Sequence, residues 1–199
     1  MRVLLTGFEA FNHNALNPSQ ELLKSLSEMQ KALPRLVISG VVLPVTFKEA
    51  FEKAKEQVLR FNPDAVLSLG LAGGRAKMSL ERIAINCIDA EIPDNIGAQP
   101  RDLKIEASGP AAYFSTLPLR QMLEAMSAVP SEISNSAGTY VCNYLMYRLL
   151  HEFNYTSRMS GFLHLPYSSE MGKTPALSLQ EMRQGLIAAL SVLGPATHG

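Results

Sequence analysis

Residues 46–70, TFKEAFEKAKEQVLRFNPDAVLSLG, predict the fold of this chain more clearly than any other stretch. Thr46 followed by Glu49 has the spacing of a capping box at a helix start, and Asn62-Pro63-Asp64 ends the helix. A short apolar run at 65–69 then has the composition of a buried strand. The stretch therefore predicts a helix followed by a strand, and we expect these helix residues to face inward: Phe47, Ala50, Phe51, Ala54, Val58 and Leu59.

The same alternation of strand and helix continues along the whole chain. We expect irregular structure or short hairpins at 92–110 and a loop at 166–177. Strands alternating with amphipathic helices predict an α/β fold, a single-domain α/β/α sandwich whose twisted, mainly parallel (mixed) sheet has helices on both faces. The remaining expected strands are 3–5, 36–43 and 159–165, with an extended segment at 81–87, and the remaining helices are 18–33 capped by Asn17, 118–126, one from Cys142 to about 152, and one after a capping box at Ser178.

Composition limits the classes of protein to consider. A chain of 199 residues is expected to form one domain, 1–199. Lysine and arginine total 18, as do aspartate and glutamate, so we expect no nucleic-acid partner. No apolar run is long enough to cross a bilayer and no signal peptide is visible, so no membrane partner is expected. Two cysteines in such a chain are expected to be reduced, which indicates a cytoplasmic protein.

Cys142 and His164 are the candidate chemical groups. A small, flexible stretch at 136–139 leads into the predicted helix, so Cys142 should lie near a helix N-terminus, where positive partial charge favours thiolate. His164 ends an apolar strand, at the sheet edge where sites gather in α/β folds. A cysteine and a histidine brought together there have the makings of an activated nucleophile. Cys87 lies in an apolar segment and is interpreted as structural.

The other histidines and the third member of a triad are less defined. His13 lies in a polar loop, His151 is on the far part of the Cys142 helix, and His198 is in the tail. A carboxylate that orients the imidazole is normally needed. Both Glu81 and Asp94 lie beside strand ends or turns, and spacing does not choose between them.

Two further features have a structural and a functional interpretation. The glycine-rich stretch at 70–75 lacks the spacing of a dinucleotide fingerprint and the lysine of a phosphate loop, so close backbone approach explains its glycines better. Phe8 and Phe11 flank the end of the first strand, where they either pack in the core or line an apolar pocket.

Several motifs in order resemble those of the pyroglutamyl peptidase I family, also called pyrrolidone-carboxylate peptidases. The resemblance covers essentially the whole chain, and runs of several residues in a fixed order are a specific signal. The motifs are TGFEAF at 6–11, NPS at 17–19, LERIAIN at 80–86, IPDN at 92–95, PAAYFSTLP at 110–118, SAGTYVCN at 136–143 and GFLHLPY at 161–167.

The resemblance implies a cysteine exopeptidase that removes an N-terminal pyroglutamyl (5-oxoprolyl) residue from peptides through an acyl-enzyme. It implies Cys142 as nucleophile, His164 as general base and then acid, and Glu81 as the group that orients the imidazole. It implies no metal and no cofactor, and a homodimer or homotetramer. The substrate pocket it implies is lined by Phe8, Phe11, Thr46, Ile92, Tyr140 and Val141.

Some positions depart from the family pattern. Leu71 stands where the family usually has glutamine, and Glu91 stands where it usually has arginine. A carboxylate facing the cysteine raises the pKa of the thiol. The alternative is therefore a catalytically weak or altered-specificity homologue that binds a pyroglutamyl-like ligand or hydrolyses a related amide.

Overall fold

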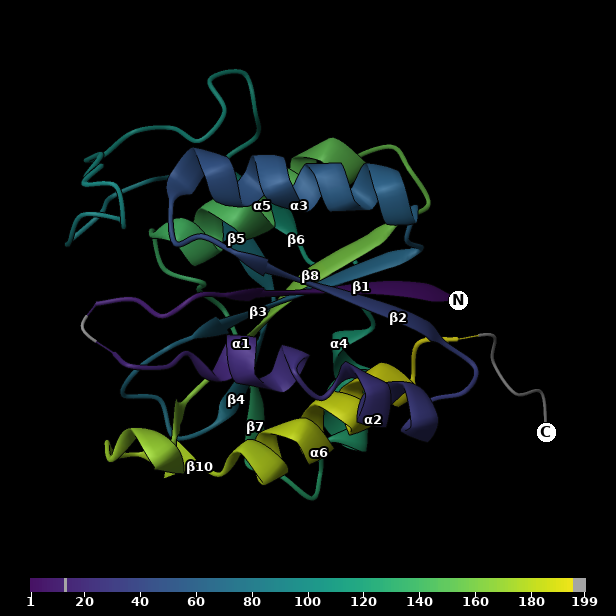
Figure 1. Ribbon diagram of the computed structural model, residues 1–199. Coiled ribbons are helices and arrows are strands. Elements are labelled where there is room, and N and C mark those ends of the chain that lie inside the picture. Colours follow the sequence, from purple (N-terminus) through teal and green to yellow (C-terminus); the bar gives the residue numbers. More distant parts are fainter. Residues whose placement is uncertain (13, 195–199) are drawn as a thin grey trace.

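A six-stranded sheet runs through the centre of the protein, whose computed structural model describes residues 1–12 and 14–194 (Figure 1). The strand order is β2-β1-β3-β8-β4-β7. Neighbours run parallel except β4 and β8, which are antiparallel, so the mainly parallel, mixed sheet is confirmed. The strands are β1 (Arg2–Phe8), β2 (Val37–Leu43), β3 (Ala65–Leu71), β4 (Met78–Glu81), β7 (Ser131–Ser134) and β8 (Met159–Leu165).

Helices cover both faces of this sheet, as the α/β/α prediction requires (Figure 1). Successive strand residues point to opposite faces, so Leu4 packs under α3 and α5 while Leu5 packs under α1, α2 and α6. The core under α1, α2 and α6 is formed of buried aliphatic and methionine side chains, and the core under α3 and α5 also contains phenylalanine and tyrosine rings. The helices are α1 (Pro18–Leu23), α2 (Leu26–Ala32), α3 (Phe47–Phe61), α4 (Leu119–Ala125), α5 (Val141–Phe153) and α6 (Leu179–Ser191).

The predicted first helix is wrong as a continuous element, because it divides into α1 and α2 at Ser25. The Ser25 hydroxyl donates to the Leu22 carbonyl at 2.7 Å, which competes with the helical backbone pattern. The predicted start is confirmed, since the Asn17 side chain accepts from the Ser19 amide as expected of an N-cap. The capping box at Ser178 is also confirmed at the start of α6.

Two details of the α3 prediction are wrong. Leu59 is 72% exposed, because the inward stripe follows Phe51, Ala54 and Val58 and turns away at the next position. The Thr46 hydroxyl accepts no backbone hydrogen bond of the helix and instead contacts the Glu49 carboxylate at 3.3 Å. A carboxylate from a distant loop takes the capping position.

That carboxylate is Asp94, which lies in the segment predicted to be irregular. One oxygen of Asp94 accepts from the Phe47 amide at 3.2 Å, and the other accepts from the amides of Ile96 and Ala98 at 3.1 and 2.8 Å. Asp94 is 6% exposed, and of its three donors the Phe47 amide belongs to a buried residue that would lose its acceptor without it. The irregular segment is thereby attached to the N-terminus of α3.

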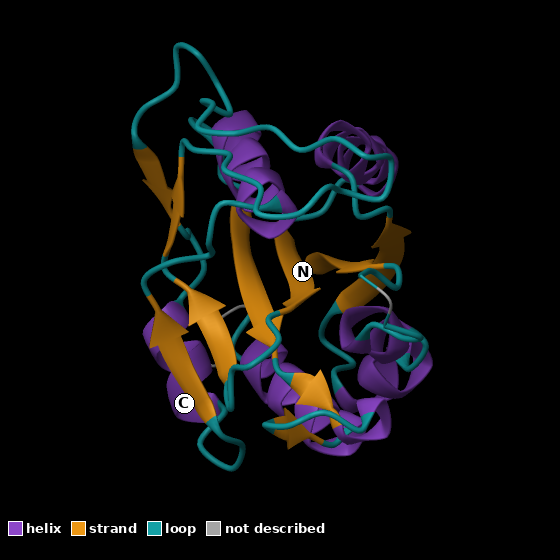
Figure 2. Ribbon diagram, turned by 90° about the vertical axis from the view of Figure 1, so that its left-hand side faces the viewer, coloured by secondary structure: helices purple, strands orange, loops and turns teal. Residues whose placement is uncertain are grey.

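Smaller elements were not predicted. The segment at 81–87, which we expected to be one extended stretch, is divided between two strands: Glu81 is the last residue of β4, and β5 follows (Ile83–Ile85). Cys87 therefore lies beyond the end of β5. β5 pairs with β6 (Ala112–Phe114) in a ribbon set apart from the main sheet (Figure 2). The expected loop at 166–177 contains β9 (Tyr167–Ser168), a short 3-10 helix (Ser169–Met171) and β10 (Ala176–Leu177). β7 was also missed, because four half-buried residues carry little periodicity.

In the described part of the chain, no helix is long and apolar enough to cross a membrane.

Replacing Asp94 by alanine tests the connection between the loop and α3. We expect the free energy of unfolding in denaturant to fall by about 1–2 kcal/mol, the usual cost of losing an N-cap acceptor. Asp94→Asn keeps one side-chain oxygen and should lose less. Equal stability of Asp94→Ala and the unaltered protein would show that these hydrogen bonds do not support the helix.

Candidate active site

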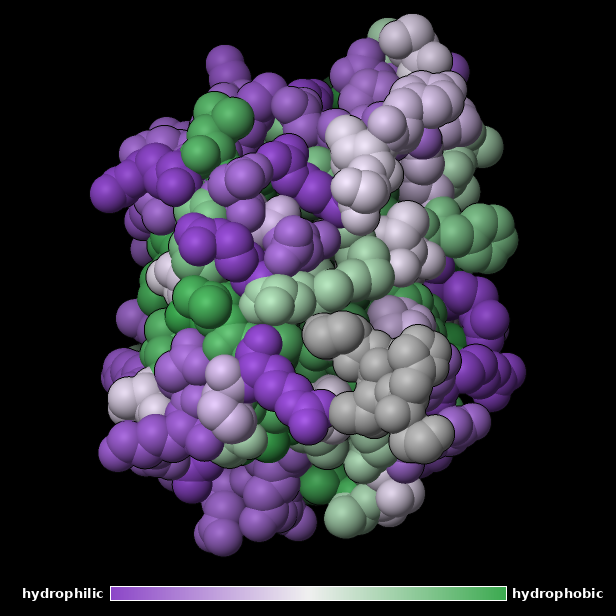
Figure 3. Space-filling model, turned by 90° about the vertical axis from the view of Figure 1, so that its right-hand side faces the viewer, coloured by the Kyte–Doolittle hydropathy of each residue, from purple (hydrophilic) through white to green (hydrophobic). Residues whose placement is uncertain are grey.

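A cavity of about 270 Å³ lies at the carboxyl ends of β1 and β3, where sites gather in α/β folds. Figure 3 shows the opposite end of the molecule, where polar residues are interspersed with apolar ones. A larger hollow of about 720 Å³ beside α2 and α4 has no cysteine or histidine among its described lining residues. The smaller cavity is lined by Phe8, Phe11, Asn12, Asn14, Asn17, Val45, Leu71, Gly73, Tyr140, Val141, Cys142 and Tyr167.

Cys142 is the second residue of α5, so its predicted place near a helix N-terminus is confirmed. The chain enters the helix through Gly138, whose φ of +76° suits glycine, and through an extended Tyr140. Cys142 is partly exposed and faces the cavity. Unpaired amide groups of the first helical turn lie beside it.

His164 and Glu81 form a buried hydrogen bond between Nδ1 and Oε1 at 2.7 Å. Their side chains are 5% and 0% exposed. In the antiparallel pair, Glu81 lies opposite Phe162, two residues before His164 on β8, so the carboxylate and imidazole share one face as diagonal neighbours. Of the two carboxylates that spacing left open, Glu81 contacts the imidazole and Asp94 caps α3.

Gly70 brings Cys142 and the imidazole to the same spot on the sheet. It is the register partner of His164 on β3. A side-chain carbon at Gly70 would lie 2.9 Å from Cys142 Sγ and 2.8 Å from the ring of Phe162, which itself packs at 4.7 Å between centroids on His164. The glycine therefore permits the close backbone approach that the glycine-rich stretch indicated.

Burial controls the charge of the cysteine and histidine. It raises the pKa of the Cys142 thiol to about 12, and the Glu81 charge adds to this rise while Arg75 opposes it. Burial also lowers the pKa of His164 below 6.5, against the opposing effect of its hydrogen bond to Glu81. Both shifts favour the neutral forms, a thiol and an uncharged imidazole, and oppose the preference for thiolate expected from the helix N-terminus.

Glu81 remains a carboxylate at neutral pH. Burial raises its pKa, but the hydrogen bond from His164 and the positive charge of Arg75 act in the opposite direction, and the net pKa lies below the ordinary value. A neutral imidazole that donates its Nδ1 proton to Glu81 has Nε2 free as an acceptor.

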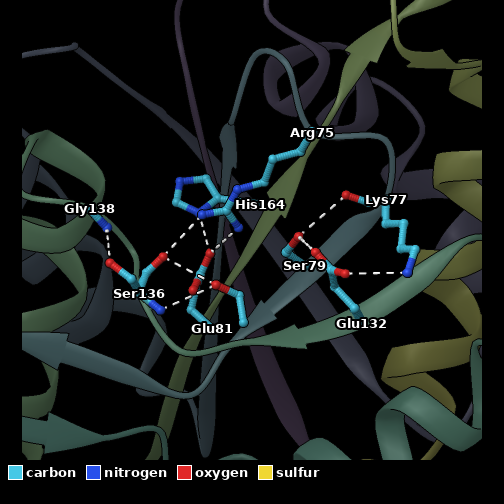
Figure 4. Close-up of polar contacts among 9 residues, drawn as sticks. Arg75, Lys77, Ser79, Glu81, Glu132, Ser136, Gly138 and His164 are labelled. Carbon is cyan, nitrogen blue, oxygen red and sulfur yellow. Dashed lines mark hydrogen bonds and ion pairs between the residues drawn. The ribbon is translucent and has the colours of Figure 1, made fainter.

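Arg75 is a residue whose importance was not predicted. Its Nη1 donates to Glu81 Oε1 at 2.6 Å, the same oxygen that His164 contacts, and its Nη2 donates to the Ser136 carbonyl at 3.0 Å. Figure 4 shows Arg75 and His164 converging on Glu81. Its position at the end of the glycine-rich stretch was the available signal.

The residues that the family resemblance placed in the pocket divide into two groups. Phe8, Phe11, Tyr140 and Val141 line the cavity. Thr46 and Ile92 are not among its described lining residues. Thr46 is 1% exposed and precedes Phe47, whose ring centroid lies 5.4 Å from that of Tyr140. Ile92 precedes Pro93, whose carbonyl accepts from the Tyr140 hydroxyl at 3.0 Å.

Asn143 is a second residue that sequence reasoning missed. It is fully buried on α5, accepts from the Ile85 amide at 2.9 Å and donates to the carbonyls of Ile85 and Cys87. It therefore holds the β5 segment, which directly follows Glu81, against the helix that carries Cys142. An amide in an otherwise apolar stretch of helix was the signal.

The remaining candidates lie elsewhere. His151 contacts the Tyr113 hydroxyl at 2.8 Å, away from Cys142, whereas His13 and His198 lie outside the described residues. Both cysteines are free thiols. Among residues 1–12 and 14–194, no group of three or more His, Cys, Asp or Glu residues could hold a metal ion.

The assembled groups have the composition needed for acyl transfer. A thiol, a neutral imidazole with one nitrogen directed by a carboxylate, and helix-terminal amides lie at or near a cavity lined by aromatic, aliphatic and amide side chains without a charged one among its described lining residues. A small, uncharged group fits such a cavity better than a charged one, because burying an unpaired charge is costly.

Comparison with known proteins gives one consistent result. Residues 1–194 match the model of the pyroglutamyl peptidase family. The chain is 43% identical to pyrrolidone-carboxylate peptidase 1 of Caldanaerobacter subterraneus over 97% of this chain and 98% of the relative, and 43% identical to the Vibrio vulnificus pyrrolidone-carboxylate peptidase over 93% and 89%.

Solved structures agree. The crystal structure of Bacillus amyloliquefaciens pyroglutamyl peptidase I superposes with a TM-score of 0.90 at 36% identity, covering 96% of this chain and 95% of that one. A mutant pyrrolidone carboxyl peptidase from Pyrococcus furiosus gives 0.89 at 39% identity, covering 96% of each. This chain therefore belongs to the pyroglutamyl peptidase family of cysteine peptidases.

Proposed function

We propose that this protein removes N-terminal pyroglutamate from peptides by a Cys142–His164–Glu81 mechanism. The supporting observation is the buried 2.7 Å hydrogen bond between His164 and Glu81, on the sheet face where Gly70 gives Cys142 room. The family match supports the substrate class.

The reaction proceeds in two steps. His164 Nε2 accepts the thiol proton as Cys142 Sγ bonds to the pyroglutamyl carbonyl carbon, and amides at the start of α5 stabilise the oxyanion. The carbon–nitrogen bond then breaks, with the same proton passing from His164 to the departing amine. In the second step His164 takes a proton from water, which attacks the thioester, and returns it to the sulfur as pyroglutamate leaves.

The cavity suits a neutral five-membered lactam. Phe11 and Tyr140 lie 5.5 Å apart between ring centroids, and Phe8 and Val141 complete an apolar wall. We propose that these four contact the lactam. Thr46 and Ile92 act behind them, through the neighbours that hold the Tyr140 ring and hydroxyl. No metal and no cofactor enters this mechanism.

We further propose that residues 1–199 act as one catalytic domain, in the cytoplasm, as a homodimer or homotetramer. The substrates are peptides with an N-terminal pyroglutamate, and neither nucleic acid nor membrane is a partner.

The altered-specificity alternative has one observation in its favour. Leu71 lines the cavity, so an apolar side chain stands where the sequence resemblance places a glutamine that could bond to a lactam. Glu91, in contrast, is exposed, and the charges acting on the Cys142 thiol are those of Glu81 and Arg75. A Leu71→Gln variant with a changed preference among cyclic amides would support this alternative.

Hydrolysis of a fluorogenic pyroglutamyl amide tests the nucleophile. The unaltered protein should release the fluorophore, and Cys142→Ser should reduce the rate to background, because a hydroxyl is a much weaker nucleophile than a thiol beside the same base. Cys87→Ser is the matched control and should retain activity.

An inactive, folded and reduced wild-type protein would contradict the proposal. Calorimetric binding of pyroglutamate by that inactive protein would favour the binding homologue, and absence of binding would remove it.

The pH dependence of kcat/KM tests the roles of His164 and Glu81. The acid limb should lie below pH 6.5, because burial lowers the pKa of His164 and its neutral form is the base. Glu81→Gln removes a charge that raises this pKa, so the acid limb should move to lower pH while kcat falls on the order of 10⁴-fold.

The matched control for Glu81→Gln is Glu132→Gln, which alters a surface carboxylate on the neighbouring strand paired with Lys77. Glu132→Gln should change neither the acid limb of the kcat/KM profile nor kcat. A Glu81→Gln variant with wild-type kcat would contradict the orienting role.

A further inference from the structure

We propose that Arg75 is a positioning residue for the reaction: it holds the Glu81 carboxylate toward His164 and ties that pair to the turn that leads into the helix carrying Cys142. This inference rests on the proposed function of the same site. It concerns the one arginine that contacts a member of the triad among the described residues.

The geometry is that of a two-armed clamp. Nη1 and His164 Nδ1 both donate to Glu81 Oε1, at 2.6 and 2.7 Å. With two donors on a single oxygen, the carboxylate has one preferred orientation. Nη2 donates to the Ser136 carbonyl at 3.0 Å, so the second arm reaches a different part of the chain (Figure 4).

Ser136 belongs to the turn that sets the start of α5. Its hydroxyl accepts from the Gly138 amide at 3.2 Å, and Gly138 has a φ of +76°. Cys142 follows at the second helical position. A shift of the Ser136 carbonyl therefore moves the turn that determines where the thiol lies relative to the imidazole.

The glycine-rich stretch delivers Arg75 to this position. The Ala72 amide donates to the Leu165 carbonyl at 2.8 Å, and the turn is closed by the Arg75 amide on the Ala72 carbonyl at 3.3 Å. Gly74 has a φ of +88°, and a side chain at Gly73 would clash with the Tyr167 ring. The motif that resembled a weak phosphate loop thus has a role in placing the guanidinium.

Burial makes the contact strong. The Arg75 side chain is 30% exposed, and Glu81 is fully buried. A charge-assisted hydrogen bond in such a place is stronger than a surface ion pair. A planar guanidinium can direct two N–H groups at two fixed acceptors, which a lysine ammonium cannot do with the same geometry.

The charge of Arg75 also acts on the reacting groups. The charged and titratable groups around the thiol and the imidazole come from three elements: Glu81 from β4, Cys142 from α5 and Arg75 from the loop before β4. Arg75 lowers the pKa of both the thiol and His164. Arg75 is therefore the cation whose charge lowers the pKa of the thiol. Glu91, at the position where the family usually has an arginine, has the opposite charge.

The test compares kcat/KM across pH for Arg75→Met, Arg75→Lys and the control Lys77→Met, using the fluorogenic pyroglutamyl amide. Lys77 lies in the same loop and pairs with exposed Glu132, so its replacement should leave rate and pH profile unchanged. Arg75→Met should lower kcat/KM on the order of 10²-fold, as expected when reacting groups are misplaced.

The pH profile separates positioning from a merely structural role. Arg75→Met removes a charge that lowers the pKa of His164, so the acid limb should move to higher pH, opposite to the shift expected for Glu81→Gln. Arg75→Lys keeps the charge, so its limb should stay near that of wild type while kcat remains reduced. An Arg75→Met variant whose acid limb and kcat equal those of the wild-type protein would overturn the proposal. If that variant does not fold, an Arg75→Lys variant with the wild-type kcat would overturn it.

Alkylation of Cys142 by iodoacetamide, followed by peptide mapping, gives a readout independent of hydrolysis. Arg75→Met should slow this reaction, because the thiol pKa rises further, and Lys77→Met should not. An unchanged alkylation rate in Arg75→Met would contradict the positioning role of Arg75. A wild-type protein that cleaves no pyroglutamyl amide would contradict the proposed peptidase activity instead, so the failure of each proposal has its own measurement.

Discussion

The site depends on one buried hydrogen bond, between His164 and Glu81, made across the only antiparallel strand pair in the described six-stranded sheet. Burying a carboxylate and an imidazole is costly unless each is paired. The pair satisfies His164 Nδ1 and Glu81 Oε1, where Arg75 adds a counter-charge, while Glu81 Oε2 is buried with no hydrogen-bond partner among the described residues. The proposed chemistry follows from this arrangement, since a neutral histidine whose Nδ1 is engaged has Nε2 free to accept a proton.

Other parts of the fold bring Cys142, the proposed nucleophile, to that pair. Gly70 leaves the space that the Cys142 sulfur and the Phe162 ring occupy. Asn143 fixes the strand after Glu81 to the helix of Cys142, and Asp94 fixes the loop behind Tyr140 to α3. Each of these contacts joins segments that are distant in sequence, so the site assembles only with the completed sheet and helix layers.

Much of the fold could be predicted from the sequence, because buried parallel strands and amphipathic helices leave clear patterns over seven or more residues. β3 and α3 are examples. The short elements could not: β4 and β7 have four residues each, too few for a period to show. The capping of α3 was misassigned to Thr46, because the competing acceptor, Asp94, lies far along the chain. Cys142 and His164 stood out through their local context, whereas the contact between Glu81 and His164, and the part played by Arg75, depend on antiparallel pairing that no local pattern reports.

The most direct test of this account is nitrogen-15 NMR of the protein labelled at histidine, with His164 assigned by comparison with His164→Gln. At about pH 7 the account predicts a neutral ring with a proton on Nδ1 and none on Nε2. It also predicts a His164 pKa below the ordinary value of 6.5. A His164 ring that is fully protonated at that pH, or that carries its proton on Nε2, would contradict it, because neither form could take the proton from Cys142.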